Sequence, residues 1–360
     1  MQKSTLYQKH VDLGAKMVPF AGFEMPVSYE GVNIEHQNVR NHLGVFDVSH
    51  MGEFFVEGLQ AEDLLQYVTS NDVSKLIDGQ AQYTCLPNEK NGIVDDLIIY
   101  KFHAQKFLLV VNASNIEKDW KWINSHNAFD AKLRDASGDY SLFAVQGPKA
   151  IQAMQSLTDV DLSSIKFYHF TENTFAGAQD VIISATGYTG SGGFELYVKN
   201  EFAGHVWDKV IEAGQDFEIK PIGLAARDTL RLEMGFCLYG NDIDESTSPI
   251  EAKLGWITKF NTDFINQEQL LKQKEEGVER KLVAFEVLDK GIPRKDYTLL
   301  DEEKNPIGHV TSGTQSPSLN KAIGLGYVKT GHHKIGQDLL IQIRKKQVRA
   351  KIVKLPFYKQ

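Results

Sequence analysis

Apolar runs rich in β-branched and aromatic residues alternate with amphipathic stretches from residue 53 to residue 146. Runs of the first kind are typical of strands, and apolar residues spaced three and four apart are typical of helices. The pattern predicts strands at 54–57, 81–86, 93–101, 107–112 and 141–146. It also predicts a helix at 61–68 and a second helix, from the capping-box sequence Ser114-Asn115-Ile116-Glu117 to about residue 126. Helices packed on one face of a mainly antiparallel sheet form an α+β layer architecture.

The pattern changes along the rest of the chain, and its last part contains strands and turns alone. Helices are predicted from Gly147 toward Leu157 and at 201–213 and 221–234, with strands at 180–185 and 194–198. Residues 266–281 are polar and predict a helix followed by a linker. Beyond Leu282, short strands are separated by breaks at Lys290-Gly291, Asn305-Pro306 and Gly331. The C-terminal part is therefore predicted to be a small all-β module.

Length and composition are those of a globular protein with two or three domains. The chain has 360 residues, of which 42% are hydrophobic and 24% are charged, as is usual for soluble proteins. No apolar run approaches the ~20 residues of a membrane span, and the first residues lack the hydrophobic core of a signal peptide. The two cysteines, Cys85 and Cys237, lie far apart, which excludes a cysteine zinc site or a disulfide framework. We therefore expect a cytoplasmic protein with no membrane partner.

The distribution of charge bears on the possible partners. The net charge is −8, which argues against general nucleic-acid binding. The C-terminal end is nevertheless basic and contains no acid; its basic residues are Arg344, Lys345, Lys346, Arg349, Lys351, Lys354 and Lys359. Such an end could steer an acidic partner toward the protein. A solvated strand edge that is protected by lysines explains the same residues equally well.

Two adjacent aspartates stand inside the apolar run that follows Asn91-Gly92. Asn-Gly favours a hairpin with a type I′ turn, because both residues tolerate positive φ. Side chains alternate along a strand, so Asp96 shares a face with Tyr100, whereas Asp95 lies on the opposite face. Burying a charge is unfavourable unless the charge is paired. The carboxylate on the buried face is therefore a structural anchor or a working acid or base, and this stretch alone favours the anchor.

A glycine-rich stretch precedes one of the later strands and has the sequence Thr186-Gly187-Tyr188-Thr189-Gly190-Ser191-Gly192-Gly193. Its glycines allow positive φ and a close approach to another group. It matches neither of the common phosphate-binding patterns, and it leads into a strand instead of a helix. That strand carries Glu195 between Phe194 and Leu196. From these residues alone, a hairpin whose glutamate faces water is the favoured interpretation.

The helix predicted at 221–234 carries two arginines, Arg227 and Arg231, which lie near one face at helical spacing. The planar guanidinium group is well suited to carboxylates and to polar ring edges. This face could therefore bind a ligand. A structural pairing with Asp228 or Glu233 is equally consistent with the sequence.

The order of these stretches along the chain is more specific than any one of them. The motifs are Phe46-Asp47-Val48-Ser49-His50-Met51-Gly52, Ala81-Gln82-Tyr83-Thr84, Val94-Asp95-Asp96-Leu97, Val111-Asn112-Ala113-Ser114-Asn115, Val145-Gln146-Gly147-Pro148, the glycine-rich stretch, Ala226-Arg227-Asp228-Thr229-Leu230-Arg231, Leu238-Tyr239-Gly240, Gly291-Ile292-Pro293-Arg294 and Thr314-Gln315-Ser316-Pro317-Ser318-Leu319. In this order they closely resemble the aminomethyltransferases, the T-proteins of the glycine cleavage system. The resemblance covers essentially the whole chain.

The resemblance implies a reaction and a fold. The family takes the aminomethyl group on the lipoyl arm of H-protein and transfers its one-carbon unit to tetrahydrofolate, giving 5,10-methylenetetrahydrofolate, ammonia and the dihydrolipoyl carrier. The implied fold is a three-lobed cloverleaf around a central folate channel, with two α+β lobes built on antiparallel sheets and a β-barrel lobe. The expected lobes are residues 1–51 with 142–265, an inserted ferredoxin-like lobe at 52–141, and a barrel at 282–360 after a linker helix at 266–281.

The resemblance also implies roles for single residues. Asp96 is expected to position the attacking pterin nitrogen and to shuttle the proton, with Asp95 as its structural partner. Glu195 is expected to accept hydrogen bonds from the aminopyrimidine edge of the pterin. Arg227 is expected to donate to the pterin carbonyl or to the glutamate carboxylates of the folate, and His50 to be structural. Further folate-binding positions are Tyr83, Tyr100, Asn112, Tyr188 and Met51, for which core packing is the alternative.

No metal, flavin or nicotinamide is implied, and the basic C-terminal strand is a candidate docking surface for H-protein, which is typically acidic. Two related functions are alternatives. Folate-dependent demethylases of sarcosine and dimethylglycine carry a similar domain but also a flavin-binding region, and this chain has no dinucleotide fingerprint. A folate-binding protein of iron–sulfur cluster assembly carries a Lys-Gly-Cys-Tyr-x-Gly-Gln signature in the region where this chain has Glu233-Met234-Gly235-Phe236-Cys237-Leu238-Tyr239-Gly240-Asn241. The match to the aminomethyltransferase pattern ranks both alternatives lower.

Overall fold

The computed structural model describes residues 1–359, which form two compact units. The first unit comprises Met1–Leu65, Val73–Tyr83 and Leu97–Asp228. The second comprises Gln66–Asp72, Thr84–Asp96 and the described residues from Thr229 onward. None of the helices in this described part combines the length and the apolar sequence that a bilayer crossing requires.

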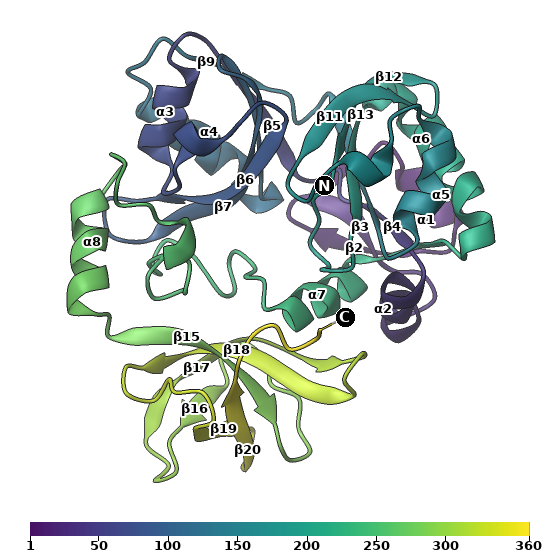
Figure 1. Ribbon diagram of the computed structural model, residues 1–360. Coiled ribbons are helices and arrows are strands. Elements are labelled where there is room, and N and C mark those ends of the chain that lie inside the picture. Colours follow the sequence, from purple (N-terminus) through teal and green to yellow (C-terminus); the bar gives the residue numbers. More distant parts are fainter. Residues whose placement is uncertain (360) are drawn as a thin grey trace. The chain divides into compact units, whose positions relative to one another are not determined.

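A six-stranded sheet is the centre of the first unit, and its strand order is β11-β12-β13-β10-β4-β14. Its strands are β4 (Gly44–Asp47), β10 (Tyr140–Gln146), β11 (Phe170–Phe175), β12 (Ala178–Ser184), β13 (Gly193–Lys199) and β14 (Lys220–Pro221). All neighbours are antiparallel except β14, which runs parallel to β4. Helices α5 (Ala150–Met154) and α6 (Asn200–Gly214) cover one face of this sheet (Figure 1).

The two faces of this sheet have different roles because side chains alternate along each strand. On β13, Leu196 and Val198 point into the core beneath the helices. Helix α6 contributes Val206, Trp207 and Val210 to the same core, at the three- and four-residue spacing of a single helix face. The opposite face of β13 therefore carries Glu195 and Tyr197, the residues from which the candidate site is built.

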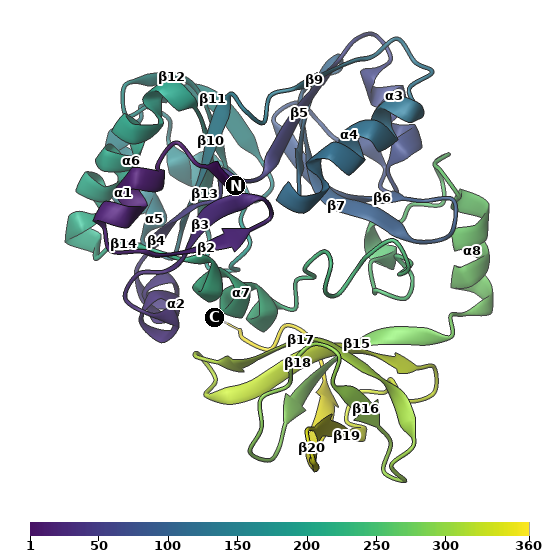
Figure 2. The same ribbon diagram turned by 180° about the vertical axis from the view of Figure 1, so that it is seen from behind.

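A five-stranded sheet has the strand order β6-β7-β8-β5-β9, and helices α3 and α4 lie on one side of it (Figure 2). Its elements are β5 (Gly52–Glu57), α3 (Ala61–Val68), β6 (Gln80–Pro87), β7 (Ile93–His103), β8 (Lys106–Val111), α4 (Ile116–Ser125) and β9 (Lys132–Asp135). Strands β6 and β7 each contribute residues to both units. These elements fall within the range expected for the inserted lobe, whose boundaries stay a prediction.

The N-terminal residues form a small sheet with the strand order β1-β3-β2. Its elements and the adjacent helices are β1 (Gln2–Lys3), α1 (Tyr7–Asp12), β2 (Lys16–Phe20), β3 (Phe23–Ser28) and α2 (Val32–Asn41). The sequence pattern did not predict this sheet, because its strands are short and two of them, β1 and β2, are largely exposed.

A closed barrel of six strands makes up most of the second unit, in the order β15-β18-β17-β16-β19-β20 (Figure 1). Its strands are β15 (Arg280–Val287), β16 (Thr298–Leu300), β17 (Pro306–Ser316), β18 (Lys321–Lys329), β19 (Asp338–Ile343) and β20 (Lys346–Val353). Helix α8 (Gln267–Glu276) precedes the barrel, and α7 (Leu224–Met234) is shared by the two units. The predicted combination of α+β layers with a C-terminal β-barrel is confirmed.

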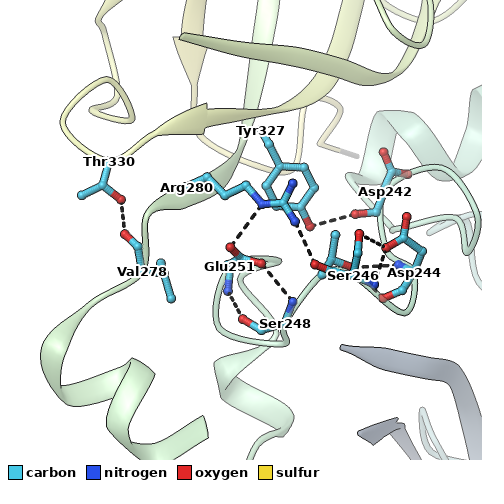
Figure 3. Close-up of polar contacts among 10 residues, drawn as sticks. Asp242, Asp244, Ser246, Ser248, Glu251, Val278, Arg280, Tyr327 and Thr330 are labelled. Atoms are coloured by element: carbon cyan, nitrogen blue, oxygen red, sulfur yellow. Dashed lines mark hydrogen bonds and ion pairs between the residues drawn. The ribbon is translucent and has the colours of Figure 1, made fainter. Parts of the chain in front are cut away.

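A loop of the second unit is fastened to the barrel by Arg280 on β15 (Figure 3). Its guanidinium donates to the Glu251 carboxylate at 3.2 Å and to the Ser246 carbonyl at 2.9 Å, and it lies over the Tyr327 ring. The Tyr327 hydroxyl donates to the carbonyl of Asp242 at 2.8 Å. These bonds fix the loop of residues 242–251 against the barrel wall.

Three local predictions were wrong for reasons of tertiary contact. The hairpin between β6 and β7 has no type I′ turn: Asn91 has positive φ, but Gly92 does not. Gly92 is needed instead for a close approach, because a Cβ atom there would lie 1.7 Å from the Glu245 carbonyl oxygen. Helix α4 begins after Asn115 without a side-chain cap, so the predicted capping box does not form. Helix α7 begins at Leu224, since Pro221 belongs to β14.

The explanation of the basic C-terminal end as a strand edge was also wrong. Strand β20 pairs with β15 on one side and with β19 on the other, so it has no free edge in the closed barrel. Two of its basic residues are paired with acids: Arg349 with Asp289 at 2.9 Å and Lys351 with Asp338 at 3.4 Å. Lys345 lies in the turn that precedes β20.

Candidate functional site

Glu195 is the buried acceptor of the first unit. It lies on the face of β13 opposite the helix-covered core and is only 8% exposed, so the water-facing interpretation was wrong. The Thr186 hydroxyl, at the start of the glycine-rich loop, donates to its Oε2 at 2.5 Å. Burial raises the pKa of Glu195, whereas this hydrogen bond and the charge of Arg227 lower it. A carboxylate held in this way is prepared to accept further hydrogen bonds from a ligand.

The glycine-rich loop adopts its path because several of its residues have no Cβ atom. Gly190, Gly192 and Gly193 have positive φ, and a Cβ at Gly187 would meet the Gln146 side chain at 2.0 Å. The Gln146 side chain in turn accepts a hydrogen bond from Thr189 at 2.8 Å. The loop is thus packed against Gln146 of β10 at both Gly187 and Thr189. Tyr188 lies between these two residues, so its position is restricted.

Arg227 and Tyr188 form a cation–aromatic pair. The guanidinium carbon of Arg227 lies 4.3 Å from the centre of the Tyr188 ring, and both side chains are half-buried. The first turn of α7 is positioned at Gly223, whose amide donates to the Glu35 carboxylate at 2.7 Å. A Cβ at Gly223 would lie 2.3 Å from the Val27 carbonyl oxygen. The close approach of α7 to β3 therefore limits the directions that the Arg227 side chain can take.

His50 is a neutral imidazole beside this arginine. Burial and the charge of Arg227 lower the pKa of His50 to about 3, although the negative charge of Asp47 opposes the shift. Its ring packs edge-on against Phe20, with centroids 5.3 Å apart. Its Nδ1 atom is buried and has no hydrogen-bond partner among residues 1–359. The expectation of a purely structural role for His50 stays a prediction.

A buried hydrogen-bond cluster around Asp47 fixes the turn that carries His50 and Met51. The Asp47 carboxylate accepts from the hydroxyl groups of Ser4 at 2.8 Å and Ser49 at 2.5 Å, and it lies 2.8 Å from His10 Nε2. Burial alone would raise the pKa of Asp47, but the hydrogen bonds from His10 and Ser49 hold it below its usual value. The carboxylate is therefore a structural anchor for this turn.

Tyr100 on β7 is a core residue that is connected to Glu195. Its side chain is completely buried, and its hydroxyl lies 3.1 Å from the Thr186 hydroxyl and 2.8 Å from the Tyr197 hydroxyl. Burial and the charge of Glu195 raise the pKa of Tyr100. The contacts of Tyr100 are thus with protein groups, and a direct contact with folate stays a prediction.

The adjacent aspartates belong to the second unit, and the strand separates them as alternation requires. Asp95 is 0% exposed, whereas the Asp96 side chain on the opposite face of β7 is half-buried. Two buried thiols lie close enough to Asp96 to respond to its charge. Burial is the main cause that raises the pKa of both thiols, and the negative charge of Asp96 contributes to the shift. The pKa of Cys85 is raised to about 12. Both thiols are therefore neutral, and neither can supply a nucleophile beside Asp96.

The beginning of β7 is held by a loop of the same unit. The Ile93 amide donates to the Asp244 carbonyl at 3.1 Å, and the Tyr239 hydroxyl donates to the Ile93 carbonyl at 2.9 Å. The loop is held in turn by the ion pair between Arg231 and Asp242 at 2.7 Å. Arg231 thus has a structural ion pair with Asp242, an acid that lies outside its own helix. Two layers of buried hydrogen bonds therefore position the strand of Asp96.

The remaining predicted site residues lie at separate places of the first unit. Tyr83 is on β6, Asn112 follows β8, and Met51 follows the Asp47 cluster; all three are half-buried. The contacts described above connect Glu195 with Arg227, Tyr188 and Tyr100 but do not include these three, whose folate-binding roles stay predictions.

Sequence reasoning missed three residues that the structure connects to Glu195 or places near its network: Thr186, Tyr197 and Glu53. Thr186 opens the glycine-rich motif, and Tyr197 follows Glu195 at the two-residue spacing of one strand face. Glu53 precedes Phe54-Phe55-Val56, so it showed the same signal as the paired aspartates, an acid within an apolar strand. The cluster can bind a polar, planar ligand through an anionic acceptor, a cationic donor and an aromatic ring. No group of three or more possible metal ligands occurs among residues 1–359.

Comparisons with known proteins identify the family of the chain. The family model of the GCVT N-terminal domain matches residues 6–262, and that of the glycine cleavage T-protein C-terminal barrel domain matches residues 280–359. A Flavobacterium psychrophilum protein named aminomethyltransferase is 63% identical over 360 residues, which is 100% of both chains. Its namesake from Bacteroides thetaiotaomicron is 57% identical over 361 residues, also covering 100% of both.

A solved structure gives the same result for the fold. The crystal structure of the glycine cleavage system aminomethyltransferase T from Bartonella henselae superposes with a TM-score of 0.93 at 34% identity, and the match covers 99% of this chain and 98% of that one. The resemblance predicted from the motifs is thereby confirmed. The chain belongs to the aminomethyltransferase family, the tetrahydrofolate-dependent T-proteins of the glycine cleavage system.

Proposed function

We propose that this enzyme transfers the one-carbon unit of the aminomethyl group on lipoylated H-protein to tetrahydrofolate. The products are 5,10-methylenetetrahydrofolate, ammonia and dihydrolipoyl H-protein. Family membership over the whole chain supports the reaction, and the group of Glu195, Arg227 and Tyr188 supports the folate. The observation that carries the proposal is the buried hydrogen-bond acceptor Glu195, together with the cation–aromatic pair of Arg227 and Tyr188.

The three residues suit different parts of a reduced pterin. Its aminopyrimidine edge offers adjacent N–H donors, which the carboxylate of Glu195 can accept in pairs. Arg227 can donate to the pterin carbonyl or to the glutamate carboxylates of the folate. The ring of Tyr188 holds the guanidinium at 4.3 Å and so limits its directions. Met51, Tyr83, Asn112 and Tyr100 complete the proposed folate contacts.

Asp96 is the proposed catalytic carboxylate. The attacking pterin nitrogen must lose a proton, and the leaving amine must gain one, so one carboxylate that serves both steps needs no second acid. The Asp96 side chain is half-buried and therefore available to a ligand, whereas Asp95 is buried completely. Hydrogen bonds to Ile93 hold the beginning of the strand that carries both. Asp95 is therefore the structural partner of the pair. The neutral thiols of Cys85 and Cys237 leave the carboxylate as the reactive group of this neighbourhood.

The partner and the location follow from the same role. We place the reaction in the cytoplasm. Lys345 in the turn before β20 and Lys346 at the start of β20 are the proposed docking residues for an acidic H-protein. Neither residue takes part in the ion pairs that hold Arg349 and Lys351. Replacement of both Lys345 and Lys346 by glutamate should raise the apparent KM for H-protein and leave the affinity for folate unchanged.

The proposal is tested by ammonia release from aminomethylated, lipoyl-bearing H-protein with and without tetrahydrofolate. Release by the wild type should depend on the folate. Asp96→Asn keeps the shape of the side chain but not the base, so its turnover should fall by about a hundredfold or more while folate binds normally. Glu195→Gln should weaken tetrahydrofolate by about tenfold to a hundredfold, because it removes a charged acceptor.

A matched control is Glu172→Gln, which changes an exposed glutamate on β11, the edge strand of the same sheet. This variant should retain wild-type turnover and wild-type folate affinity. If the wild type binds tetrahydrofolate but releases no ammonia above background, the transfer reaction is wrong. If it does not bind tetrahydrofolate at all, the assignment of Glu195 and Arg227 also fails.

A further inference from the structure

Helix α2 carries two buried charged residues, Glu35 and Arg40, to which the proposed reaction assigns no role. Glu35 is 0% exposed and Arg40 is 4% exposed. Five positions along an α-helix rotate the side chain by about 140° around the helix axis, so these two side chains leave α2 in different directions. Burying a charge is unfavourable unless hydrogen bonds compensate for the lost water. The hydrogen-bond partners of the two residues therefore indicate what each of them holds in place.

Glu35 holds the beginning of α7, which lies beside α2 in both views (Figure 1, Figure 2). Its Oε2 accepts a hydrogen bond from the Gly223 amide at 2.7 Å. Its Oε1 accepts from the amides of Tyr29 at 2.7 Å and Gly31 at 2.9 Å, in the segment that leads into α2. The Gly223 carbonyl in turn accepts from the Arg227 amide at 3.2 Å. Glu35 therefore fixes the helical turn from which the Arg227 side chain extends.

Arg40 holds the glycine-rich loop. Its Nη1 donates to the Thr189 carbonyl at 2.6 Å and to the Ser191 hydroxyl at 2.7 Å, and both acceptor residues are buried. The Thr189 hydroxyl donates to Gln146 on the neighbouring strand. Thr189 is thus held both by α2 and by β10, directly after Tyr188 in the chain. Arg40 therefore limits the movement of the backbone that carries Tyr188.

The two segments that α2 holds are the ones that carry the cation–aromatic pair. Arg227 extends from the first turn of α7 and Tyr188 from the glycine-rich loop, and the guanidinium carbon lies 4.3 Å from the ring centre. Such a pair requires the cation to lie over the face of the ring. A shift of either segment would move the guanidinium away from this position. One helix that is hydrogen-bonded to both segments keeps them at a constant separation.

We propose that helix α2 positions the Arg227–Tyr188 pair, with Glu35 and Arg40 as the positioning residues. Neither residue contacts the folate in this role. Glu35 acts on Arg227 through Gly223, and Arg40 acts on Tyr188 through Thr189. The consequence for folate binding rests on the proposed function, whereas the geometry of the pair can be measured without any ligand.

Three variants change these attachments and nearly preserve the size of the side chain. Glu35→Gln keeps one acceptor oxygen and replaces the other with an NH2 group, which cannot accept from a backbone amide. Arg40→Met removes the donors to Thr189 and Ser191. Arg40→Lys keeps a charged donor and should preserve part of the attachment, although the lysine lacks the planar fork of arginine.

The direct test follows the Cδ–Hδ signals of Arg227 by NMR, without folate, in protein that contains 13C-labelled arginine. Their assignment comes from their loss in Arg227→Met. The Tyr188 ring shifts these signals through its ring current, and Tyr188→Leu gives their position without the ring. In Glu35→Gln and Arg40→Met the signals should move toward the Tyr188→Leu position. In Arg40→Lys they should lie between those of Arg40→Met and those of the wild type.

A second measurement is the affinity for tetrahydrofolate. Glu35→Gln and Arg40→Met should each raise the Kd by about threefold to tenfold, because the pair is less often in place. Glu35→Gln should weaken binding no further in the Arg227→Met background, and Arg40→Met should weaken it no further in the Tyr188→Leu background. A merely structural role predicts the same change in Kd with and without the residue that is positioned.

Two surface ion pairs supply the matched controls. Glu30→Gln breaks the exposed pair with Lys220, in the segment just before α2. Arg134→Met breaks the exposed pair with Asp139 on the rim of the five-stranded sheet. Neither variant should change the Arg227 signals or the Kd of tetrahydrofolate.

Each outcome decides between the two levels of the argument. Unchanged Arg227 signals in folded Arg40→Met and Glu35→Gln would overturn the positioning role, whatever happens to the folate. Equal losses of affinity in the parent and in the Arg227→Met or Tyr188→Leu backgrounds would overturn it as well. If Glu35→Gln does not fold, the comparison of Arg40→Met with Arg40→Lys decides alone. If the signals move as expected but the wild type does not bind tetrahydrofolate, the positioning role stands and the proposed function fails.

Discussion

Asp242 and Glu53 are both buried carboxyl groups, yet their surroundings are opposite. Asp242 is 0% exposed and pairs with Arg231 at 2.7 Å. It also accepts from the hydroxyls of Thr311 at 2.5 Å and Ser312 at 2.9 Å. Glu53 is equally buried, but neither of its oxygens has a partner in the described part of the chain.

The difference separates a structural anchor from a group whose contribution to stability depends on pH. A buried charge with a complete set of hydrogen bonds fixes the geometry of its surroundings, as Asp242 does for the loop that holds the beginning of β7. A buried acid without partners fixes nothing and lowers stability. The protonation of such a group then depends mainly on burial and on neighbouring charges. His50 belongs to the second class, since its Nδ1 has no partner in residues 1–359 and its neighbour is Arg227.

The largest effect is expected at the anchored pair. Arg231→Met leaves the Asp242 carboxylate buried without its cation, and we expect the free energy of unfolding of the second unit to fall by about 3–5 kcal/mol. Denaturant titration followed by tryptophan fluorescence measures this loss. The double variant Arg231→Met/Asp242→Asn, which buries no charge, should lose clearly less than the sum of the two single changes.

The control for this prediction is an ion pair of the same kind at the surface. Arg349 makes two side-chain hydrogen bonds to Asp289, but both side chains are exposed. Arg349→Met should therefore leave stability nearly unchanged, because exposed pairs contribute little. If Arg231→Met and Arg349→Met lowered the free energy of unfolding equally, burial would not explain the stabilising effect of the Arg231–Asp242 pair.

Most elements of the fold could be predicted from local pattern alone. The helix predicted at 61–68 has those bounds, and the strand predicted at 194–198 extends by one residue at each end. Both follow from the alternation of apolar and polar residues over a few positions. The turn at Asn91-Gly92 could not be predicted in the same way, because Gly92 is required by the Glu245 carbonyl, far along the chain.

The candidate site shows the same division. Alternation correctly separated the completely buried Asp95 from the half-buried Asp96. The burial of Glu195 could not be predicted, because the sheet face that carries it is covered by side chains from a second sheet. The bond between Tyr100 and Tyr197 joins residues 97 positions apart. Only the family resemblance pointed to Glu195 as a ligand-binding residue.

The second effect in size is expected at Glu53 and depends on pH. Its pKa is raised in the folded state, so the unfolded chain releases this proton above about pH 4.5 while the folded chain keeps it. Stability is therefore lost as the pH rises, by about 1.4 kcal/mol per unit until the folded pKa is reached. Glu53→Gln should be more stable than the wild type at pH 7 and equal to it below pH 4.

Thermal unfolding of both proteins across this pH range measures the difference. Glu57→Gln, at the exposed end of the same strand, is the matched control and should follow the wild type at every pH. A constant difference between Glu53→Gln and the wild type would mean that Glu53 does not change its protonation on unfolding. The contrast with Asp242 would then lose its physical basis.

The smallest effect is expected at His50, and its sign is opposite. The pKa of His50 is lowered to about 3 by burial and by Arg227, so the unfolded chain binds a proton below about pH 6.5 and the folded chain does not. Stability due to this group is complete above pH 6.5 and declines as the pH falls toward 3. The nearby negative charge of Asp47 opposes the shift and limits this loss. His50→Gln should flatten the decline between pH 6.5 and pH 4, and exposed His205→Gln should not. An unchanged slope in His50→Gln would show that His50 is charged in the folded protein, and Arg227 could not then lie beside it without a further acid.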